Sequence, residues 1–323
     1  MLAIAPTASA TPGPGPLPAS VGSPRCVVPS VGGIALVDVS VATLWREPGI
    51  QRRSDRPSLR DPADLVAWNR SMRGAAARRW LVGNVQTQAL YGQRVLVRDR
   101  RGHWFKVAVL DEPDSQDPRG YPGWVPKRQL CAQGDVPVVT DGSDYVVVLA
   151  KRASLHGQER TVRVGFGTRL AMADDPRTSV WTEVMSPDGP ARILSSEVSA
   201  PLTPTAGSIL RQGRRFLGLR YLWGGLSAWG FDCSGLIWNL FRAHGMTIPR
   251  DADPQFRSGR PISRKNLRPA DLIFWGNQNY VHHVALYVGR GKMMEAPDSA
   301  GSVRIVPVRW SGYAGARRYL PKQ

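Results

Sequence analysis

Long apolar runs, metal-binding clusters and acidic residues are absent or scarce in this chain of 323 residues. No apolar run approaches the roughly 18 residues that a membrane-spanning helix needs, so no such helix is expected. There are only three cysteines and five histidines, and His282 and His283 are the only adjacent pair. Neighbouring strand residues point in opposite directions and make poor joint ligands for one ion, so we expect no zinc site. The length suits two or three domains.

Acidic residues are few relative to basic ones: 25 Asp and Glu stand against 43 Lys and Arg, which gives a net charge of +18. Such an excess favours an anionic partner, namely nucleic acid, a membrane surface or the polyanionic wall of a bacterial cell. The basic residues are scattered in pairs such as Arg52-Arg53 and Arg317-Arg318, without a nucleic-acid-binding motif. We therefore interpret the charge as a general surface property, suited to contact with an anionic cell-wall polymer, and expect no nucleic-acid partner.

The first 200 residues divide into a leader and two β-rich segments. Residues 1–25 are poor in apolar bulk, and Ala8-Ser9-Ala10 resembles the end of a signal peptide, although a basic n-region and a full apolar h-region are missing. Residues 26–134 predict a small five-stranded barrel with one or two inserted helices from Asp61 to Trp80, with Asp61-Pro62 at the helix start. Residues 135–200 predict a second, shorter β-barrel. The stretches GHWFKVAV and GYPGWVPKRQL resemble a bacterial SH3-like domain.

Cys26 and Cys131 lie at opposite ends of the first predicted barrel, whereas Cys233 lies in another domain. In an exported protein, the simple account is one disulfide and one free thiol. In a cytosolic protein, Cys26 and Cys131 would be small hydrophobic residues. The pairing therefore depends on the compartment.

Residues 201–323 predict an α+β domain in which helices precede an antiparallel meander of strands, with a loop from Pro249 to Arg268 between them. A turn at Gly230-Phe231-Asp232 delivers Cys233 to the first turn of a helix whose apolar residues recur at helical spacing and which ends near Gly245. The positive end of the helix dipole and the free backbone N–H groups there favour a thiolate. A buried structural cysteine is the alternative on this segment alone.

A cysteine nucleophile needs a base within hydrogen-bond reach and a third group that orients the base. His103, His156 and His244 are isolated in the sequence, whereas His283 opens a predicted strand. If the following hairpin pairs symmetrically about Gly289, His283 faces Glu295 across the two strands. Cys233, His283 and Glu295 would then form a triad, although a slip of one residue would separate the last two.

The segments YLWGG, GFDCSGLIW, IPR, LRPADLIFWG and HHVALYVGRGKMMEAP resemble, in this order, the NlpC/p60 family of bacterial cell-wall cysteine peptidases. The resemblance covers roughly the last 120 residues. It implies a reduced papain-like fold and hydrolysis of peptidoglycan stem peptides or muropeptides, typically between γ-D-glutamate and the diamino acid. It also implies that Cys233 is the nucleophile, His283 the base and Glu295 the third residue, with no cofactor and a secreted or wall-associated location.

The same resemblance suggests substrate-binding residues. Tyr221 and the Asp232–Ser234 turn match positions that line the substrate groove, and Tyr221 alternatively packs in the core while Asp232 alternatively caps the helix. Two SH3-like modules before such a domain resemble a subgroup that needs a free N-terminal L-Ala, in which the first barrel contributes a tyrosine, here Tyr121. Gln86 stands where that subgroup has an amine-binding carboxylate, and Ala252 stands where relatives often carry a hydroxyl.

Two other functions compete with a γ-D-glutamyl–diamino acid peptidase. The chain would be a non-catalytic cell-wall binding protein if the enzyme fold had lost activity, a hypothesis that the intact Cys, His and Glu disfavour. It would be an amidase or acyltransferase if the same fold served another acyl transfer. Product analysis with defined muropeptides separates these hypotheses.

Overall fold

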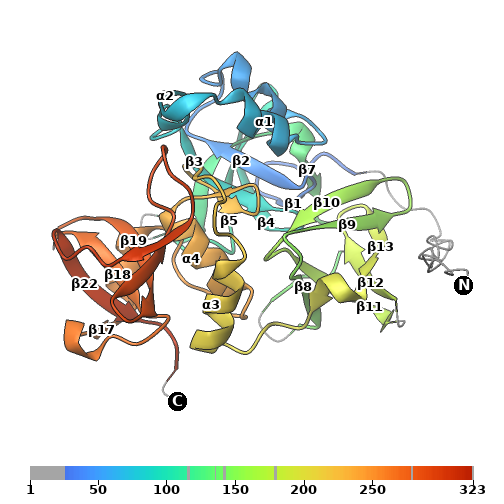
Figure 1. Cartoon of the computed structure of the whole chain (residues 1–323). Helices are drawn as coiled ribbons and strands as arrows, with labels where there is room; N and C mark the ends of the chain where they lie inside the picture. Colours follow the sequence, from blue (N-terminus) through green and yellow to red (C-terminus); the bar gives the residue numbers. More distant parts are fainter. Residues whose placement is uncertain are drawn as a thin grey trace, which may run out of the picture.

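A computed structural model describes residues 26–114, 117–134, 136–140, 143–177, 180–277 and 279–321. The predicted leader lies outside these residues. The chain forms three main sheets, of seven, seven and six strands, with most of the helices gathered around the first and third. Figure 1 shows the first sheet, in blue and cyan, above the second in green and yellow and the third in orange and red, with α3 and α4 between them.

The first sheet has the order β3-β2-β6-β5-β4-β1-β7, with seven strands where the sequence predicted five. The stretch 34–45 is divided into two strands because the chain bends at Val39-Ser40: β1 pairs with β4 and β7, whereas β2 pairs with β3 and β6. The strands are β1 (Ile34–Val37), β2 (Val41–Trp45), β3 (Val85–Leu90), β4 (Arg94–Arg101), β5 (Trp104–Val109), β6 (Tyr121–Pro126) and β7 (Leu130–Ala132).

Two short helices, α1 (Leu65–Ser71) and α2 (Gly74–Arg79), interrupt the first sheet between β2 and β3. The predicted start at Asp61-Pro62 is wrong. Asp64 caps α1, because its Oδ1 accepts a hydrogen bond from the N–H of Ala67 at 2.8 Å, which satisfies one of the free donors of the first turn. Cys26 and Cys131 are joined as a disulfide that ties the start of the described chain to β7.

The second sheet has the order β10-β9-β13-β12-β11-β8-β14. Its strands are β8 (Tyr145–Val148), β9 (Arg152–Gly157), β10 (Thr161–Gly165), β11 (Arg169–Arg177), β12 (Trp181–Ser186), β13 (Gly189–Leu194) and β14 (Val198–Ser199). In β12 the residues alternate between buried and half-buried, as expected when one face of a strand covers a core. Strand β9 was not predicted from the sequence.

The third sheet has the order β17-β22-β18-β19-β20-β21, so the last strand pairs beside β18 and does not continue the meander. The helices and strands of this region are α3 (Ala206–Arg214), β15 (Leu226–Ser227), β16 (Gly230–Phe231), α4 (Cys233–Arg242), α5 (Ala252–Ser258), β17 (Arg260–Ile262), β18 (Leu272–Gly276), β19 (Val281–Gly289), β20 (Lys292–Glu295), β21 (Arg304–Pro307) and β22 (Tyr313–Arg318). The sequence predicted a loop from Pro249 to Arg268, where the structure has α5 and β17.

One apolar cluster runs through all three sheet regions, so they share a core. Phe166 of the second region packs edge-on against Phe216, with ring centroids 5.2 Å apart, and Phe216 packs against Phe231 at 5.0 Å. Trp45 and Trp68 of the first region belong to the same cluster. Burial of apolar surface across the boundaries therefore fixes the relative positions of the three regions.

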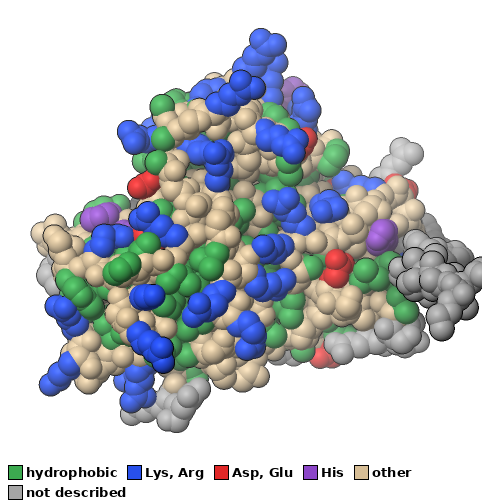
Figure 2. Space-filling view, in the orientation of Figure 1, with side chains coloured by type: hydrophobic (Ala, Val, Ile, Leu, Met, Phe, Trp, Pro, Cys, Tyr) green, Lys and Arg blue, Asp and Glu red, His purple; other side chains and the backbone are tan. Residues whose placement is uncertain are grey.

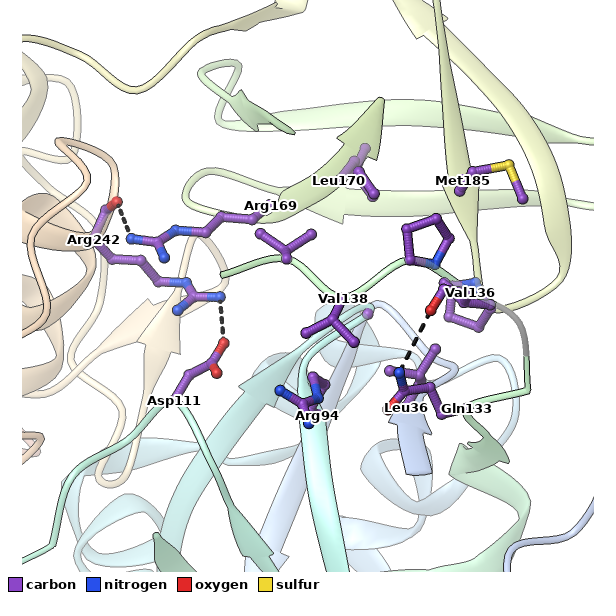
Figure 3. Close-up of a pocket in the computed structure, with 15 residues that line it drawn as sticks. Leu36, Arg94, Asp111, Gln133, Val136, Val138, Arg169, Leu170, Met185 and Arg242 are labelled. Atoms are coloured by element: carbon purple, nitrogen blue, oxygen red, sulfur yellow. Dashed lines mark hydrogen bonds and ion pairs between the residues drawn. The ribbon is translucent and has the colours of Figure 1, made fainter. Parts of the chain in front are cut away.

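The carboxyl end of α4 lies where the three regions meet (Figure 3). Arg242 pairs with Asp111 of the first region, with Nη2 3.0 Å from Oδ2, and its carbonyl accepts a hydrogen bond from Arg169 of the second region at 3.0 Å. A cation beside the last carbonyls of a helix also favours its dipole. Both preceding regions thus hold the end of α4.

Lys and Arg side chains spread over the face of the molecule shown in Figure 2, where acidic side chains are few. This distribution agrees with the scattering of basic residues along the sequence. Among the described residues, no helix is long and apolar enough to cross a membrane.

Candidate active site

Cys233 is the first residue of α4, and Asp232 is its N-cap. The side chain of Asp232 accepts a hydrogen bond from the N–H of Gly235 at 2.6 Å. Gly235 has no room for a side chain, since a Cβ there would lie 2.1 Å from the carbonyl oxygen of Gly225. Cys233 is the free cysteine of the described chain and is 9% exposed, so the sulfur lies at the bottom of an opening and not on an open surface.

His283 lies in β19 and Glu295 at the end of β20, and their side chains meet: Nε2 is 2.8 Å from Oε2. The predicted contact is present, but the predicted register is wrong. Tyr287 pairs with Met293 and not with Gly291, because the hairpin closes more tightly, with Gly289 opposite Lys292. The register differs from the expected one by two residues, which leaves every side chain on its predicted face, so His283 and Glu295 still meet diagonally.

The ring of His283 is also close enough to the sulfur of Cys233 for the two groups to interact electrostatically. Burial lowers the pKa of His283, but the interactions with Cys233 and with the hydrogen-bonded carboxylate of Glu295 outweigh it and raise this pKa to about 9. The imidazole is therefore protonated at neutral pH. Because Glu295 occupies Nε2, the other ring nitrogen is the one available to the sulfur.

Two arginines hold Glu295, which is fully buried. Arg304 donates from Nε and Nη2 to Oε1 at 3.0 and 2.9 Å, and Arg309 donates to both carboxylate oxygens at 2.8 Å. Burial raises the pKa of Glu295, but hydrogen bonds from Arg309, His283 and Arg304 outweigh it, so the pKa lies well below its ordinary value. Glu295 is thus a carboxylate held in one orientation.

A groove opens beside Cys233 and His283, and its walls come from the first and third sheet regions. Tyr221 lies in this groove with Cys233 and His283. Burial first, then the neighbouring Cys233 and Asp232, raise the pKa of the Tyr221 hydroxyl well above its ordinary value. The hydroxyl therefore stays protonated and can donate a hydrogen bond. The described lining residues are Arg79, Val82, Tyr221, Trp223, Cys233, Trp275, His282, His283, Pro297, Asp298, Ser299, Ala300, Arg304 and Arg309.

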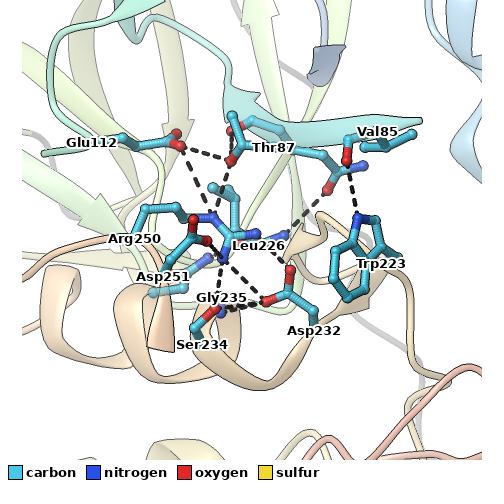
Figure 4. A network of polar contacts seen from close by, with 12 residues as sticks. Val85, Thr87, Glu112, Trp223, Leu226, Asp232, Ser234, Gly235, Arg250 and Asp251 are labelled. Carbon is cyan, nitrogen blue, oxygen red and sulfur yellow. Dashed lines mark hydrogen bonds and ion pairs between the residues drawn. The ribbon is translucent and has the colours of Figure 1, made fainter. Parts of the chain in front are cut away.

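Asp232 and Ser234 point instead into a buried network around Arg250 (Figure 4). Arg250 is completely buried and donates from Nη2 to Oδ2 of Asp232 at 2.8 Å and from Nη1 to Oγ of Ser234 at 3.0 Å. Its Nε donates to Thr87 of β3 at 3.0 Å. The carboxylate of Asp232 is therefore shared between the helix cap and Arg250.

The network continues into the first region through Glu112. Its Oε2 accepts a hydrogen bond from Thr87 at 2.7 Å and lies 4.0 Å from Nε of Arg250. Burial raises the pKa of Glu112 to about 8, against the opposing effect of Arg250. Glu112 is thus mostly protonated at neutral pH, and Asp232 is the principal counter-charge of Arg250.

Tyr121 of β6 reaches across to Asp251, the N-cap residue of α5, and its hydroxyl donates to Oδ2 at 2.8 Å. The Asp251 side chain is 48% exposed, so its carboxylate remains accessible. Gln86 lies in β3 beside the contact in which the Trp223 indole donates to the carbonyl of Val85 at 2.9 Å. Gly224, with φ of +71°, permits this close approach, because a Cβ there would lie 2.5 Å from a methyl group of Val85.

Sequence reasoning missed Arg250, Asp251, Arg304 and Arg309. The first two stand in a stretch taken as a loop, although the adjacent Ala252 was noted. In the sequence, Arg304 and Arg309 do not differ from the other scattered basic residues. The pairing of β20 with β21 sets Glu295 opposite Arg304, and this pairing identifies Arg304 alone. Among the described residues, no group of three or more His, Cys, Asp or Glu side chains is arranged to hold a metal ion.

Residues 218–317 match the NlpC/P60 family. The chain is 38% identical to a gamma-D-glutamyl-L-lysine dipeptidyl-peptidase of Bacillus cereus over 308 residues, which cover 89% of this chain and 91% of the relative. It is 34% identical to a protein of the same name from Bacillus subtilis, over 83% of this chain and 91% of the relative.

A crystal structure of an NlpC/P60 family protein from Bacillus cereus resembles the whole fold, with a TM-score of 0.84 and 37% identity. The match covers 90% of this chain and 100% of that one. The similarity therefore extends over all three sheet regions and not over the cysteine-bearing region alone.

Proposed function

Since this chain belongs to the NlpC/P60 family of cysteine peptidases that act on peptidoglycan peptides, we propose that it cleaves the bond between γ-D-glutamate and the diamino acid of a stem peptide. The observation that carries the proposal is the chain of contacts from Cys233 through His283 to Glu295 at the edge of the groove. We assign Cys233 as the nucleophile, His283 as the acid and base, and Glu295 as the residue that orients the ring.

The proposed reaction begins when the Cys233 thiolate attacks the carbonyl carbon of the scissile amide. Backbone N–H groups at the start of α4 and the protonated hydroxyl of Tyr221 stabilise the oxyanion that forms. His283 gives its proton to the leaving amine as the C–N bond breaks, which leaves a thioester on the sulfur. His283 then removes a proton from water, and the resulting attack on the thioester breaks the C–S bond, releases the acid and restores the Cys233 thiolate beside protonated His283.

The two Bacillus relatives are named as dipeptidyl-peptidases, and we propose that this chain likewise removes a dipeptide from a free amino end. The accessible carboxylate of Asp251, held by Tyr121, is the best candidate to bind the substrate ammonium. Asp232 is a weaker candidate, because Gly235, Ser234 and Arg250 already occupy its oxygens. The Asp232 carboxylate and the Ser234 hydroxyl would then stabilise the start of α4 through their contacts with Arg250, without touching the substrate.

We propose further that the chain has three domains, at 26–134, 135–200 and 201–323. The sheets at 34–132 and 145–199 form SH3-like barrels in the first two domains, and the third domain is papain-like. The contacts of the first barrel with Arg250 and Trp223 support its role as a wall of the substrate site. The Cys26–Cys131 disulfide supports a secreted or wall-associated location, because disulfides persist in oxidising compartments. The positive charge suits contact with an anionic wall polymer.

Mass spectrometry of L-Ala-γ-D-Glu-diamino acid peptides tests the reaction. The wild type is expected to release L-Ala-γ-D-Glu and the free diamino acid, whereas Cys233→Ala is expected to lose at least 1,000-fold in rate, because the attacking atom is gone. Equal product from both proteins would overturn the mechanism. N-acetylation of the peptide is expected to slow cleavage strongly, and unchanged cleavage would overturn recognition of the amine by Asp251 and Tyr121.

A further inference from the structure

The groove beside the catalytic pair carries a surplus of positive charge. Among its described lining residues, Arg79, Arg304 and Arg309 stand against the single acid Asp298. The side chains of Arg304 and Arg309 are 49% and 46% exposed, so their outer faces are open to the groove even though Glu295 lies beneath them. When the carboxylates of Glu295 and Asp298 are set against these three arginines, and the His283 imidazolium against the Cys233 thiolate, the groove keeps a surplus of one positive charge.

The guanidinium groups are held in place before any ligand arrives. Each makes two hydrogen bonds to Glu295, and Arg309 also lies over the ring of Trp275, with Cζ 5.3 Å from the ring centroid. For Nη1 of Arg304, the described residues provide no hydrogen-bond acceptor. A planar guanidinium fixed in this way presents its remaining N–H donors to a carboxylate at a small cost in side-chain entropy.

Arg79 adds a third arginine to the lining of the groove, from the first sheet region. It is the last residue of α2, in the first sheet region, and its side chain is exposed and makes no ion pair or hydrogen bond with the described residues. Val82, three residues further along the chain, lines the same groove. An exposed arginine that lines the same groove as Arg304 and Arg309 and has no partner among the described residues is a donor available to a bound ligand.

The leaving half of the substrate is the part that meets these arginines. The leaving amine takes its proton from His283, so the diamino acid that carries this amine lies on the His283 side of the sulfur. On that side, the ring of His283 packs against Trp275 at 5.4 Å between centroids, and beyond the ring lie Glu295 and its two arginines.

We propose that Arg79, Arg304 and Arg309 form a subsite for a carboxylate carried by the leaving diamino acid, an inference that rests on the proposed function. Two carboxylates have this chemistry. One is the main-chain carboxylate, which is free when the diamino acid is the last residue of the peptide. The other is a side-chain carboxylate, which diaminopimelate has and lysine lacks. The arginines would repel the side-chain ammonium of lysine, which has no carboxylate beside it.

Four peptides separate the two sources: L-Ala-γ-D-Glu followed by lysine or by diaminopimelate, each with a free or an amidated main-chain carboxyl. The quantity measured is kcat/KM for each peptide with the full chain. Removal of the carboxylate that binds the subsite is expected to lower kcat/KM of the wild type by about tenfold or more, the effect of losing a charge-assisted hydrogen-bonded pair. A loss on amidation identifies the main-chain carboxylate as the bound group, whereas a loss on replacing diaminopimelate by lysine identifies the side-chain carboxylate.

Arg79→Gln is the main variant, because Arg79 does not contact Glu295 and its replacement leaves the catalytic pair intact. It is expected to reduce severalfold the ratio of kcat/KM between the carboxylate-bearing peptide and the amidated lysine peptide, while kcat/KM for the amidated lysine peptide changes little. Arg304→Gln is expected to slow all four peptides by disturbing Glu295 and, in addition, to reduce the ratio between them. Arg73→Gln, an exposed change at the N-cap of the same helix α2, is the matched control and should leave the ratio unchanged.

Each outcome supports or overturns a defined statement. If the wild type cleaves all four peptides with equal kcat/KM, the subsite is refuted and the proposed peptidase function stands. If Arg79→Gln leaves the ratio between the peptides unchanged and Arg304→Gln slows every peptide by the same factor, Arg304 only holds Glu295 and the subsite is again refuted. If none of the four peptides is cleaved by the wild type, the proposed function itself fails.

Discussion

At the scale of single residues, the chemistry depends on how the carboxylate of Glu295 is shared between His283 and the two arginines, Arg304 and Arg309. One oxygen holds the ring of His283, and both oxygens hold arginines. The arginines keep Glu295 ionised, and the remaining attraction between Glu295 and the ring still contributes to the raised pKa of His283. A carboxylate in this position therefore orients the imidazole and also sets the pH range in which it carries the proton.

The pH dependence of the rate tests this division of charge. In the proposed reaction His283 must be protonated to release the leaving amine, so the rate is expected to fall at alkaline pH with a midpoint of about 9. In Glu295→Gln the hydrogen-bonded carboxylate is lost, so the pKa of His283 falls toward its ordinary 6.5 and the decline moves to lower pH. The measurement is kcat/KM against pH for both proteins.

Glu47→Gln, an exposed acidic residue remote in sequence from the site, serves as the control and should keep the wild-type profile. An alkaline decline that does not move in Glu295→Gln would show that Glu295 does not govern the proton on His283. The same protonation contributes to stability: it is fully present below the unfolded pKa of 6.5 and is lost as the pH rises through about 9.

At the scale of elements, helix α4 is held at both ends by neighbouring regions. Arg250 links its N-cap, Asp232, to Thr87 of β3, while Arg242 and its carbonyl reach Asp111 and Arg169 at the other end. The position of Cys233 along the groove therefore depends on contacts outside the helix. The pair of Arg250 and Asp232 brings opposite charges to 2.8 Å, with side chains that are 0% and 10% exposed, so removal of one partner leaves the other charge without compensation.

Arg250→Gln is expected to lower the free energy of unfolding by about 3–5 kcal/mol, because it leaves Asp232 buried without its counter-charge. It should also lower kcat/KM, since the helix start that carries Cys233 loses its connection to the first sheet. Urea unfolding and peptide hydrolysis measure the two effects.

The matched control is Arg257→Gln on α5, where the arginine is half exposed and pairs only with Asp253, four residues earlier, and with a backbone carbonyl. This change should cost no more than about 1 kcal/mol. Equal unfolding midpoints for the wild type and Arg250→Gln would contradict the structural role given to the buried pair.

At the scale of the whole molecule, the chain combines one free thiol with one disulfide. Cys26 and Cys131 close a loop that contains the whole first sheet, while Cys233 stays reduced in the groove. This arrangement keeps the reactive sulfur separate from the structural pair. A disulfide of this kind persists in oxidising compartments and is rare in the cytosol.

Thiol titration of the unfolded protein tests the arrangement. Without reductant, one thiol per chain is expected, and after reduction three. Iodoacetamide applied to the folded, unreduced protein should modify Cys233 alone and abolish peptide hydrolysis, as read by peptide mapping and activity together. Three thiols in the unreduced protein isolated from its native compartment would contradict both the pairing and the proposed export.

Much of the site could be predicted from the sequence because its signals are local. The cap at Asp232, the helix that begins at Cys233 and the alternation that places His283 and Glu295 on one face each follow from a few neighbouring residues. The predicted register was wrong by two residues, yet the His283–Glu295 contact survived because a two-residue shift preserves the face of a strand. Helix α5 was missed because its seven residues are too few to show a clear apolar period.

The amino-acid sequence by itself determined the proposal that Cys233, His283 and Glu295 carry the chemistry, because caps, turns and strand alternation act over a few positions. Only the tertiary structure decided what surrounds them. Arg250 reaches Thr87 across 163 residues of sequence and Tyr121 reaches Asp251 across 130, and no local pattern specifies such partners. For the same reason no sequence pattern distinguishes Arg79, Arg304 and Arg309 from other surface arginines, and only the tertiary structure shows that all three line one groove.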